Sequence, residues 1–330
     1  MGDSMDRTPT EPRRRPSPAN RLGLDYRDVP SRKVDCPLID VHTHVKTVEH
    51  AGVFFEAATA YGISRVASMT PLDKVDALRA AYGDRMAFIA IPRWEEFEPT
   101  TAFRDRWLAD LAAFRDKGAR LCKFWSAPQL RQMLGLTLDH PVMRPVVQGA
   151  CDLDYAFMVH VGDPSVWWQP GGKYAKSRAA GTKREQYGQL EWFLEWVTPR
   201  KVIAAHMGGY VEDVRLLQDL LGRYPNLLLD TSATKWMVRE IARQPDAVRE
   251  FVIRNQDRIL FGTDSVADEE HGFEHYASRY WAHLKLWETP YRGESPIEDP
   301  DADDPPRLAG LDLPSGALRK LYCENTQELV

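Results

Sequence analysis

The segment PLIDVHTH, residues 37–44, is a short apolar run that ends in polar side chains. Seven further runs of this kind follow: ISRVASMT (63–70), MAFIAIPRW (86–94), ARLCKFW (119–125), AFMVHVGD (156–163), KVIAAHMGG (201–209), NLLLDTSA (226–233) and RILFGTDS (258–265). Runs without polar alternation are typical of strands that are covered on both faces, as in parallel sheets. These eight runs therefore predict a parallel sheet.

The segments between the runs have helical periodicity. Residues 103–118 place Phe103, Trp107, Leu111 and Phe114 at spacings of three and four, and Gly118 is a candidate C-cap. Alternating strands and helices predict an α/β protein, and eight repeats favour a distorted (β/α)8 TIM barrel. An open doubly wound sheet remains the alternative, because periodicity does not reveal closure.

The chain is expected to form one domain, residues 34–330, and to end in a helix over 315–330. Residues 1–33 are rich in Arg, Pro, Asp and Ser, so we expect a disordered or loosely attached tail. The acidic, proline-rich stretch 293–310 is typical of a surface loop.

Composition excludes several classes of protein. The net charge of −5 disfavours a dedicated nucleic-acid binder. No apolar run approaches the roughly 20 residues that span a bilayer, and no apolar segment follows the N-terminal arginines as in a secretory signal. Four scattered cysteines without a CxxC pair indicate reduced thiols. We therefore expect a cytoplasmic enzyme or binding protein without nucleic-acid or membrane partners.

Polar side chains lie at the predicted strand ends, where barrel enzymes carry their catalytic groups. Residues i and i+2 of a strand share a face, so His42 and His44 can both reach one ion. Alone, this pair could equally be two satisfied polar residues. The joint pattern is more informative, because other runs add Lys123, His160, His206 and Asp264 at the same predicted rim.

Six segments resemble the amidohydrolase superfamily, in the amidohydrolase-related branch that includes hydrolases and non-oxidative decarboxylases. They are IDVHTH (39–44), VHVGDP (159–164), AAHMGG (204–209), LLLDTSA (227–233), RILFGTDS (258–265) and LRKLYCENTQELV (318–330). The resemblance implies a distorted TIM barrel with a divalent metal. It implies that His42, His44, His160 and Asp264 are the ligands, and that His206 lies beside the metal-bound water or the substrate.

The chemistry of these residues agrees with that assignment. A divalent ion lowers the pKa of bound water toward neutrality, and a carboxylate such as Asp264 can take the proton and return it to a leaving group. His206 could polarise a carbonyl or stabilise an oxyanion. One ion is favoured, with zinc suiting the nitrogen-rich set and manganese suiting a decarboxylase. A second ion would require His206 as a ligand and Lys123 as a carboxylated bridge.

Several residues are candidates for contacting the substrate. Lys123 lies in the apolar run LCKFW and could pair with a substrate carboxylate. The loop 163–184 carries five cationic side chains and one aspartate, so it could attract an anion, and Trp167 and Trp168 could form a wall. A solvated loop with two packed tryptophans is the alternative. Arg93 is a further pocket candidate.

Asp163 has two possible roles, since it could orient His160 by a hydrogen bond or cap the next segment.

For the whole chain, the favoured function is a metal-dependent hydrolase that attacks an amide, ester or lactone carbonyl of a small, anionic substrate. The alternatives are a metal-dependent decarboxylase of an aromatic or unsaturated acid and a barrel that serves only as a binding protein. A homodimer is possible, because related barrels are often dimers.

Overall fold

The computed structural model describes residues 16–302 and 305–330. Its main sheet has strands that run parallel, in the order β8-β7-β6-β5-β4-β3-β2-β1-β9. The strands are β1 (Leu38–Val45), β2 (Ile63–Met69), β3 (Met86–Ala90), β4 (Leu121–Trp125), β5 (Ala156–His160), β6 (Val202–Ala204), β7 (Leu227–Asp230), β8 (Ile259–Leu260) and β9 (Ser265–Ala267). Each predicted run therefore contributes a strand.

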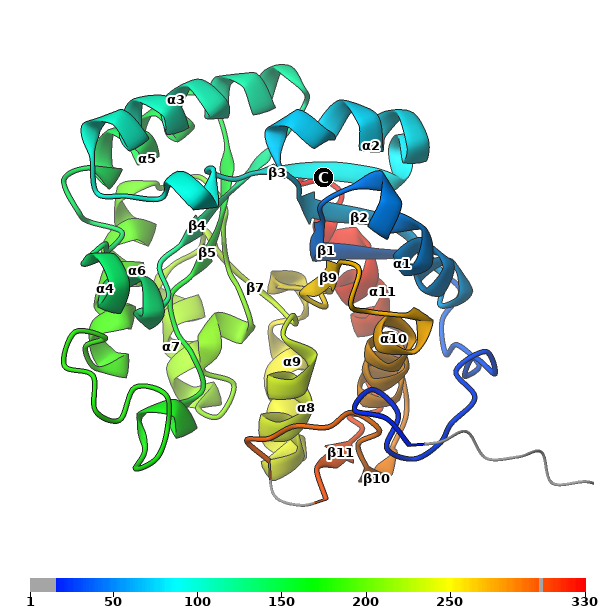
Figure 1. The fold of residues 1–330 in the computed structure, drawn as a ribbon. Coiled ribbons are helices and arrows are strands. Elements are labelled where there is room, and N and C mark those ends of the chain that lie inside the picture. Colours follow the sequence, from blue (N-terminus) through cyan, green and yellow to red (C-terminus); the bar gives the residue numbers. More distant parts are fainter. Residues whose placement is uncertain (1–15, 303–304) are drawn as a thin grey trace, which may run out of the picture.

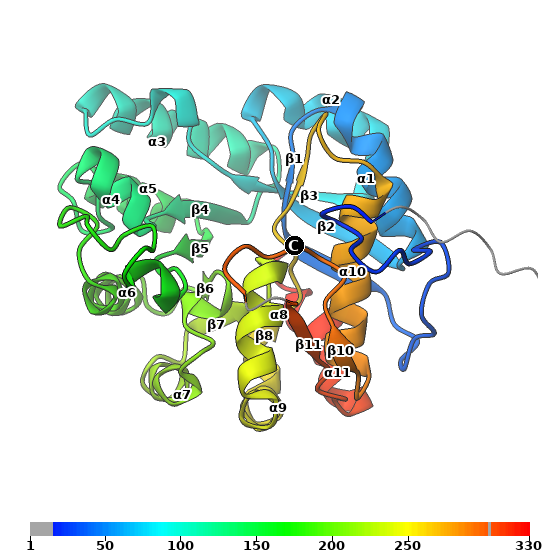
Figure 2. The same cartoon turned by 60° about the horizontal axis from the view of Figure 1, so that its bottom comes forward.

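The segment 259–267 closes the sheet into a ring. Its first part, β8, pairs with β7, and its last part, β9, pairs with β1. Between them, the Val41 N–H donates to the Phe261 carbonyl at 2.9 Å and the Asp264 N–H donates to the His42 carbonyl at 2.8 Å. One interrupted strand thus occupies the eighth position, as expected for the predicted (β/α)8 barrel. In Figure 2, β1 to β3 lie on one side of the barrel and β4 to β7 on the other, with helices outside them.

The helices lie around the outside of the strands (Figure 1). They are α1 (Val48–Ala60), α2 (Val75–Tyr82), α3 (Thr101–Asp116), α4 (Pro128–Leu134), α5 (Met143–Asp152), α6 (Lys183–Trp196), α7 (Val214–Arg223), α8 (Thr234–Arg243), α9 (Pro245–Arg254), α10 (Phe273–Glu288) and α11 (Ser315–Tyr322). None of the helices in the described residues is long and apolar enough to cross a bilayer.

Helix α3 shows how the sequence pattern produces this arrangement. The side chain of Thr100 accepts a hydrogen bond from the backbone N–H of Phe103, which satisfies a donor at the start of the helix. The apolar residues of the predicted stripe are all buried, and Gly118 has a positive φ of 81° just after the helix. The last helix is shorter than expected: α11 ends at Tyr322, and a 3₁₀ turn follows at Glu324–Thr326.

Residues 16–33, which were expected to be loosely attached, pack against the barrel. Tyr26 is fully buried, and its hydroxyl donates to the Ala19 carbonyl at 2.8 Å. Arg32 forms an ion pair of 2.7 Å with the buried Glu288 at the end of α10. These contacts attach residues 16–33 to the domain expected over 34–330; the rest of the expected tail, residues 1–15, lies outside the described residues.

The described parts of the stretch 293–310, residues 293–302 and 305–310, contain regular structure that the expected surface loop did not include. They contain most of an antiparallel pair formed by β10 (Arg292–Glu294) and β11 (Arg307–Ala309). Asp299 in the same stretch is buried against Arg239 of α8, at 2.5 Å. The acidic side chains of this stretch therefore include a structural partner for the barrel.

Candidate metal centre

A cavity of about 440 Å³ opens at the carboxyl ends of the barrel strands. Its polar lining consists of the residues expected at the strand ends: His42, His44, Lys123, His160, His206 and Asp264. The rest of the lining is apolar: Met69, Trp94, Phe97, Trp125, Leu130, Met133 and Leu134. The structure thus gathers the predicted polar residues around one space with a hydrophobic wall.

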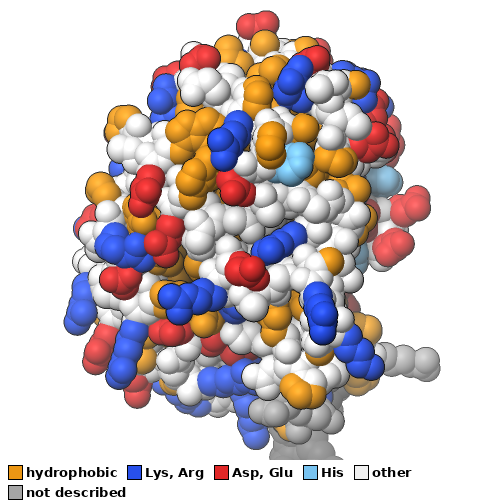
Figure 3. Space-filling view, turned by 90° about the vertical axis from the view of Figure 1, so that its left-hand side faces the viewer, with side chains coloured by type: hydrophobic (Ala, Val, Ile, Leu, Met, Phe, Trp, Pro, Cys, Tyr) orange, Lys and Arg blue, Asp and Glu red, His pale blue; other side chains and the backbone are white. Residues whose placement is uncertain are grey.

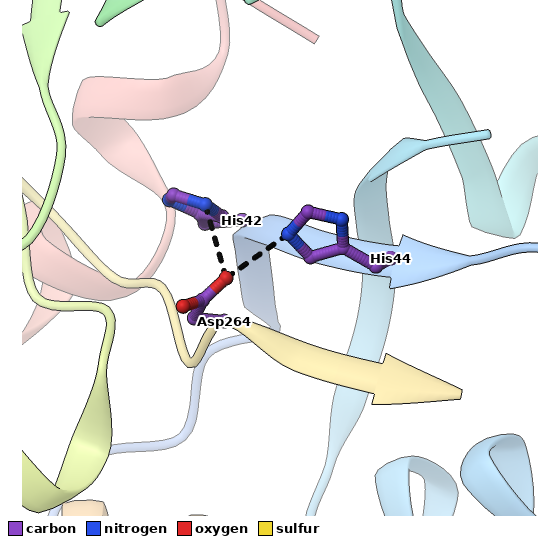
Figure 4. Close-up of side chains that lie close together, drawn as sticks. All are labelled: His42, His44 and Asp264. Atoms are coloured by element: carbon purple, nitrogen blue, oxygen red, sulfur yellow. Dashed lines mark hydrogen bonds and ion pairs between the residues drawn. The ribbon is translucent and has the colours of Figure 1, made fainter. Parts of the chain in front are cut away.

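Three side chains converge at the floor of this cavity. His42 and His44 project from the same strand, and both imidazoles face Asp264 (Figure 4). The Asp264 Oδ1 atom lies 3.3 Å from His42 Nε2 and 3.0 Å from His44 Nε2. Two imidazole nitrogens and one carboxylate oxygen form a donor set that suits zinc and neighbouring divalent metals.

Asp264 reaches this point through an unusual backbone conformation. Its φ is 61°, a left-handed value that costs a non-glycine residue free energy. The hydrogen bond from its N–H to the His42 carbonyl holds the conformation in place. The pKa of Asp264 is well below its ordinary value: burial raises it, but the charge of His42 and hydrogen bonds from His42 and His44 outweigh that effect. The carboxylate is therefore ionised.

Asp230, at the end of β7, fixes the orientation of His42. Its Oδ2 atom lies 2.9 Å from His42 Nδ1, and both residues are buried. An ionised carboxylate accepts, so Nδ1 carries a proton. When the ring loses its second proton, as metal binding requires, the lone pair is left on Nε2, which faces the cavity. Metal-binding histidines usually donate their other ring N–H to a carboxylate in this way. The same Nε2 lies 3.3 Å from Lys123 Nζ, which can only donate to it.

The orientation and tautomer of His206 are also fixed by hydrogen bonds. It has a φ of 59°, and its backbone N–H donates to Asp230 Oδ1 at 2.9 Å. Its Nδ1 atom lies 2.7 Å from the Ser232 hydroxyl, which itself donates to Asp230. Since that hydroxyl has one proton, it accepts from His206 Nδ1, which leaves the lone pair on Nε2. Burial, and next the charge of His160, lower the pKa of His206 well below its usual value, so the ring is neutral.

Lys123 lies on the cavity floor and is almost completely buried. Burial lowers its pKa to about 8, while the negative charges of Asp230 and Asp264 act in the opposite direction. An ammonium group next to two carboxylates in a confined cavity can pair with an anionic group of a ligand. A lysine with this lowered pKa also has an appreciable neutral fraction above neutral pH.

His160 lines the cavity but does not join the group formed by His42, His44 and Asp264. Its Nε2 atom is 2.8 Å from Asp163 Oδ1, and its ring contacts that of His206 at a centroid distance of 4.6 Å. Asp163 also accepts a 2.5 Å hydrogen bond from Tyr174. Of the two readings of Asp163, the structure shows the one in which it orients His160.

The three other predicted substrate residues are not among those that line the cavity. Arg93 forms a bidentate ion pair with Asp110 of α3 and lies at a neighbouring hollow. Trp167 donates to Asp301, and Trp168 donates to the Gly181 carbonyl. The two tryptophans are thus packed side chains of the loop, as in the alternative reading.

The positive charge of the loop 163–184 is partly neutralised. Lys183 pairs with Glu212, and Lys173 donates to Gln129 and lies 4.6 Å from the centroid of the Trp167 ring. Figure 3 shows the side of the protein that carries α4 and α6, where Lys and Arg side chains are interspersed with Asp and Glu. The ion pair with Glu212 thus cancels the charge of Lys183, whereas Lys173 keeps its charge beside neutral partners.

Sequence reasoning missed three features of the site. Asp230 and Ser232 lie in the segment LLLDTSA, where a carboxylate at a predicted strand end was an available signal. Trp236 of α8 packs edge-on against His206 at 5.2 Å and against Trp167 at 5.0 Å, and no local pattern marks it. The apolar wall from α4 was also missed, because its register against the barrel depends on tertiary packing.

Comparison with known proteins places this geometry in a family context. A family model described as amidohydrolase matches residues 39–330. No curated protein sequence matches the chain significantly. The match begins at the first strand and includes every residue of the cavity lining.

Solved structures share the fold at low sequence identity. 2,6-Dihydroxybenzoate decarboxylase from Rhizobium has 14% identity and a TM-score of 0.51, with 89% of this chain and 98% of that chain covered. 5-Carboxyvanillate decarboxylase from Sphingomonas paucimobilis has 11% identity and a TM-score of 0.50, covering 89% and 98%. Dihydroorotase from Campylobacter jejuni has 11% identity and a TM-score of 0.50, covering 89% and 82%. At these identities the similarity establishes the fold alone.

Proposed function

The chain belongs to the amidohydrolase family, and we propose that it is a metal-dependent hydrolase that cleaves an amide, ester or lactone of a small anionic substrate. The observation that carries this proposal is the convergence of His42 Nε2, His44 Nε2 and Asp264 Oδ1 at the cavity floor. We propose one zinc ion on these three atoms, because two nitrogens and a carboxylate match its preferred ligands. Such an ion supplies Lewis acidity and lowers the pKa of a bound water.

The side chains around that position would divide the work. Asp264 is ionised and offers a second carboxylate oxygen, which can accept a proton from the attacking water and return it to the leaving group. His206 presents a lone pair on Nε2, so it would act as an acceptor or a ligand. This differs from the expected oxyanion donor, because a donor would need a proton on Nε2 that the network with Ser232 places on Nδ1.

Two further groups would bind and orient the substrate. Lys123 is the one cationic side chain in the described lining, and its Nζ can pair with a substrate carboxylate. His160 would face the substrate with its Nδ1, since its Nε2 is engaged by Asp163. The apolar wall would exclude bulk water, which strengthens electrostatic interactions inside the cavity.

A decarboxylase is the second candidate, and the cavity wall favours it. Trp94 and Trp125 meet edge to face at 5.9 Å, and Phe97 and Leu130 extend the same surface. An aromatic acid could place its ring against this wall and its carboxylate toward Lys123. Manganese would suit this reaction, because it prefers oxygen-rich coordination that includes the substrate.

Product analysis distinguishes the two reactions. The purified protein, loaded with zinc or manganese, is incubated with a panel of lactones, amides and carboxyl-labelled aromatic acids in ¹⁸O-water. Hydrolysis incorporates ¹⁸O into an acid product, whereas decarboxylation releases labelled carbon dioxide. Asp264→Asn should abolish either activity, and Glu269→Gln on the surface serves as the control. If metal analysis finds no stoichiometric ion and Asp264→Asn leaves activity unchanged, the proposed site is wrong.

A further inference from the structure

A second concave surface lies at the opposite end of the barrel from the metal-donor cavity. Two adjoining hollows of about 640 and 450 Å³ are lined by residues at the amino ends of the strands, including Met86 of β3 and Ala156 of β5. The two hollows share Arg120 and Leu329, so they form one continuous groove, here called the polar groove. In barrels of this type this end is not used for catalysis.

The polar groove is strongly cationic, although the protein as a whole has a net charge of −5. Its carboxylate side chains are those of Asp84, Asp154 and Glu328. Its cationic side chains are those of Arg65, Arg79, Arg115, Lys117, Arg120, Arg200 and Lys201. This sign asymmetry creates a positive potential over a hollow, where field lines are concentrated.

Three of these cations come from alternate strands and lack a partner. Arg65 belongs to β2, and Arg120 and Lys201 directly precede β4 and β6. Within residues 16–302 and 305–330, none of the three side chains forms a hydrogen bond or an ion pair. Lys117, by contrast, is paired with Asp76. Three unpaired like charges around one groove repel one another, and a bound anion would relieve that repulsion.

Buried donor atoms point to the same conclusion. The Nε atoms of Arg65 and Arg200 are inaccessible to solvent and have no acceptor in the described part of the chain. A buried N–H without an acceptor is unfavourable, so a shift of either side chain that exposed its Nε to an anion in the groove would gain a hydrogen bond. Asp154 does not serve, because its nearest approach to Arg115 and Arg200 is 3.9 Å and its side chain is 82% exposed.

We propose that the polar groove binds a small anion that carries two or more phosphate groups. The guanidinium group of Arg120 offers paired N–H donors that match phosphate oxygens, and Arg65, Arg200 and Lys201 add positive charge around it, although Arg200 Nη2 already donates to the Cys151 carbonyl. The volumes of the hollows are in the range of small-molecule sites. Since the groove is separate from the cavity floored by His42, this site does not depend on the proposed hydrolase activity.

Calorimetric titration with inorganic tripolyphosphate tests the proposal. We expect one saturable site on the purified protein at low salt, with affinity that weakens as salt rises. Arg120→Gln should weaken binding by about tenfold, because this residue lines both hollows. Arg104→Gln, which removes a surface charge on α3, should leave binding unchanged. Asp264→Asn should also retain it, which separates this site from the metal centre.

Clear outcomes would overturn the proposal. They are the absence of saturable binding at low salt, or equal losses for Arg120→Gln and Arg104→Gln. Binding of hexaglutamate with no binding of tripolyphosphate would instead assign the polar groove to an acidic peptide. If Arg120→Gln lowers the melting temperature, the double variant Arg65→Gln/Lys201→Gln provides the test, since neither of these side chains has a partner to lose.

Discussion

Substitution of Asp230 by asparagine tests the organisation of the metal centre at a residue that is not itself a proposed ligand but holds the ligand His42. The carboxylate accepts from His42 Nδ1, the His206 backbone N–H, and the backbone N–H and hydroxyl of Ser232. Asparagine keeps the shape but replaces one oxygen with an NH₂ group. If that group faces His42, the imidazole must accept at Nδ1 and carry its proton on Nε2, where it can no longer bind a metal.

The structure sets the size of two separate effects. Asp230 is fully buried, and hydrogen bonds to charged groups contribute about 1.5–3 kcal/mol each. Asparagine removes the charge and one acceptor. In the metal-free protein this should lower the free energy of unfolding by about 2–4 kcal/mol. The inverted tautomer should weaken zinc binding by about 10–100-fold, as is usual when the partner of a metal-binding histidine is removed.

Both effects can be measured on the same samples. Urea unfolding of the metal-free protein gives the stability change, and competition with a chromogenic chelator gives the zinc affinity. Asp219→Asn, at a side chain that is 59% exposed, is the matched control for loss of one carboxylate. Zinc affinity equal to that of the unmodified protein, in a folded Asp230→Asn variant, would refute the assignment of His42 Nε2 as a ligand.

Three further predictions concern the scaffold. Burial lowers the pKa of His283 to about 3, so as pH falls the unfolded state takes up the proton before the folded state does, and stability decreases. His283→Gln removes this effect. In urea titrations, the slope of unfolding free energy against pH between pH 6 and 4 should fall by about 1.4 kcal/mol per pH unit. Arg239→Met should cost about 3–5 kcal/mol in the same assay, because it leaves the buried Asp299 without its cation. A Cβ on Gly209 would lie 2.1 Å from the Gly162 carbonyl oxygen at a φ of +68°, so Gly209→Ala should sharply lower the melting temperature, whereas Gly188→Ala, with open space in α6, should raise it slightly.

The sequence was sufficient for the barrel because its signals are local. Each apolar run is long enough to form a strand, and the stripe of Phe103, Trp107 and Leu111 is a helical pattern that any packing partner would bury. The convergence of the polar residues at the strand ends was equally predictable, since parallel strands bring their carboxyl ends to one rim. His42, His44 and Asp264 meet for that reason.

The rest depended on contacts between distant residues. Whether Trp167 faces the cavity is decided by Trp236 and Asp301, which lie 69 and 134 positions away in the chain. The charge of Lys183 is neutralised by Glu212, which belongs to a different βα unit. A sequence window reveals that such residues are aromatic or charged, but their direction is set by partners outside the window.

The backbone at His206 and Asp264 connects the fold to the chemistry. Both residues follow strands and both have left-handed φ values, which cost about 1–3 kcal/mol each for residues with a side chain. In both cases the backbone N–H donates to a group that is linked to His42. The Asp264 N–H donates to the His42 carbonyl, and the His206 N–H donates to the Asp230 carboxylate, which also accepts from His42 Nδ1. The strained conformations and the orientation of His42 therefore stabilise one another. If either residue relaxed to an unstrained φ, its side chain would turn away from the cavity floor. Selection for a functional site would therefore maintain the left-handed conformations despite their cost in stability.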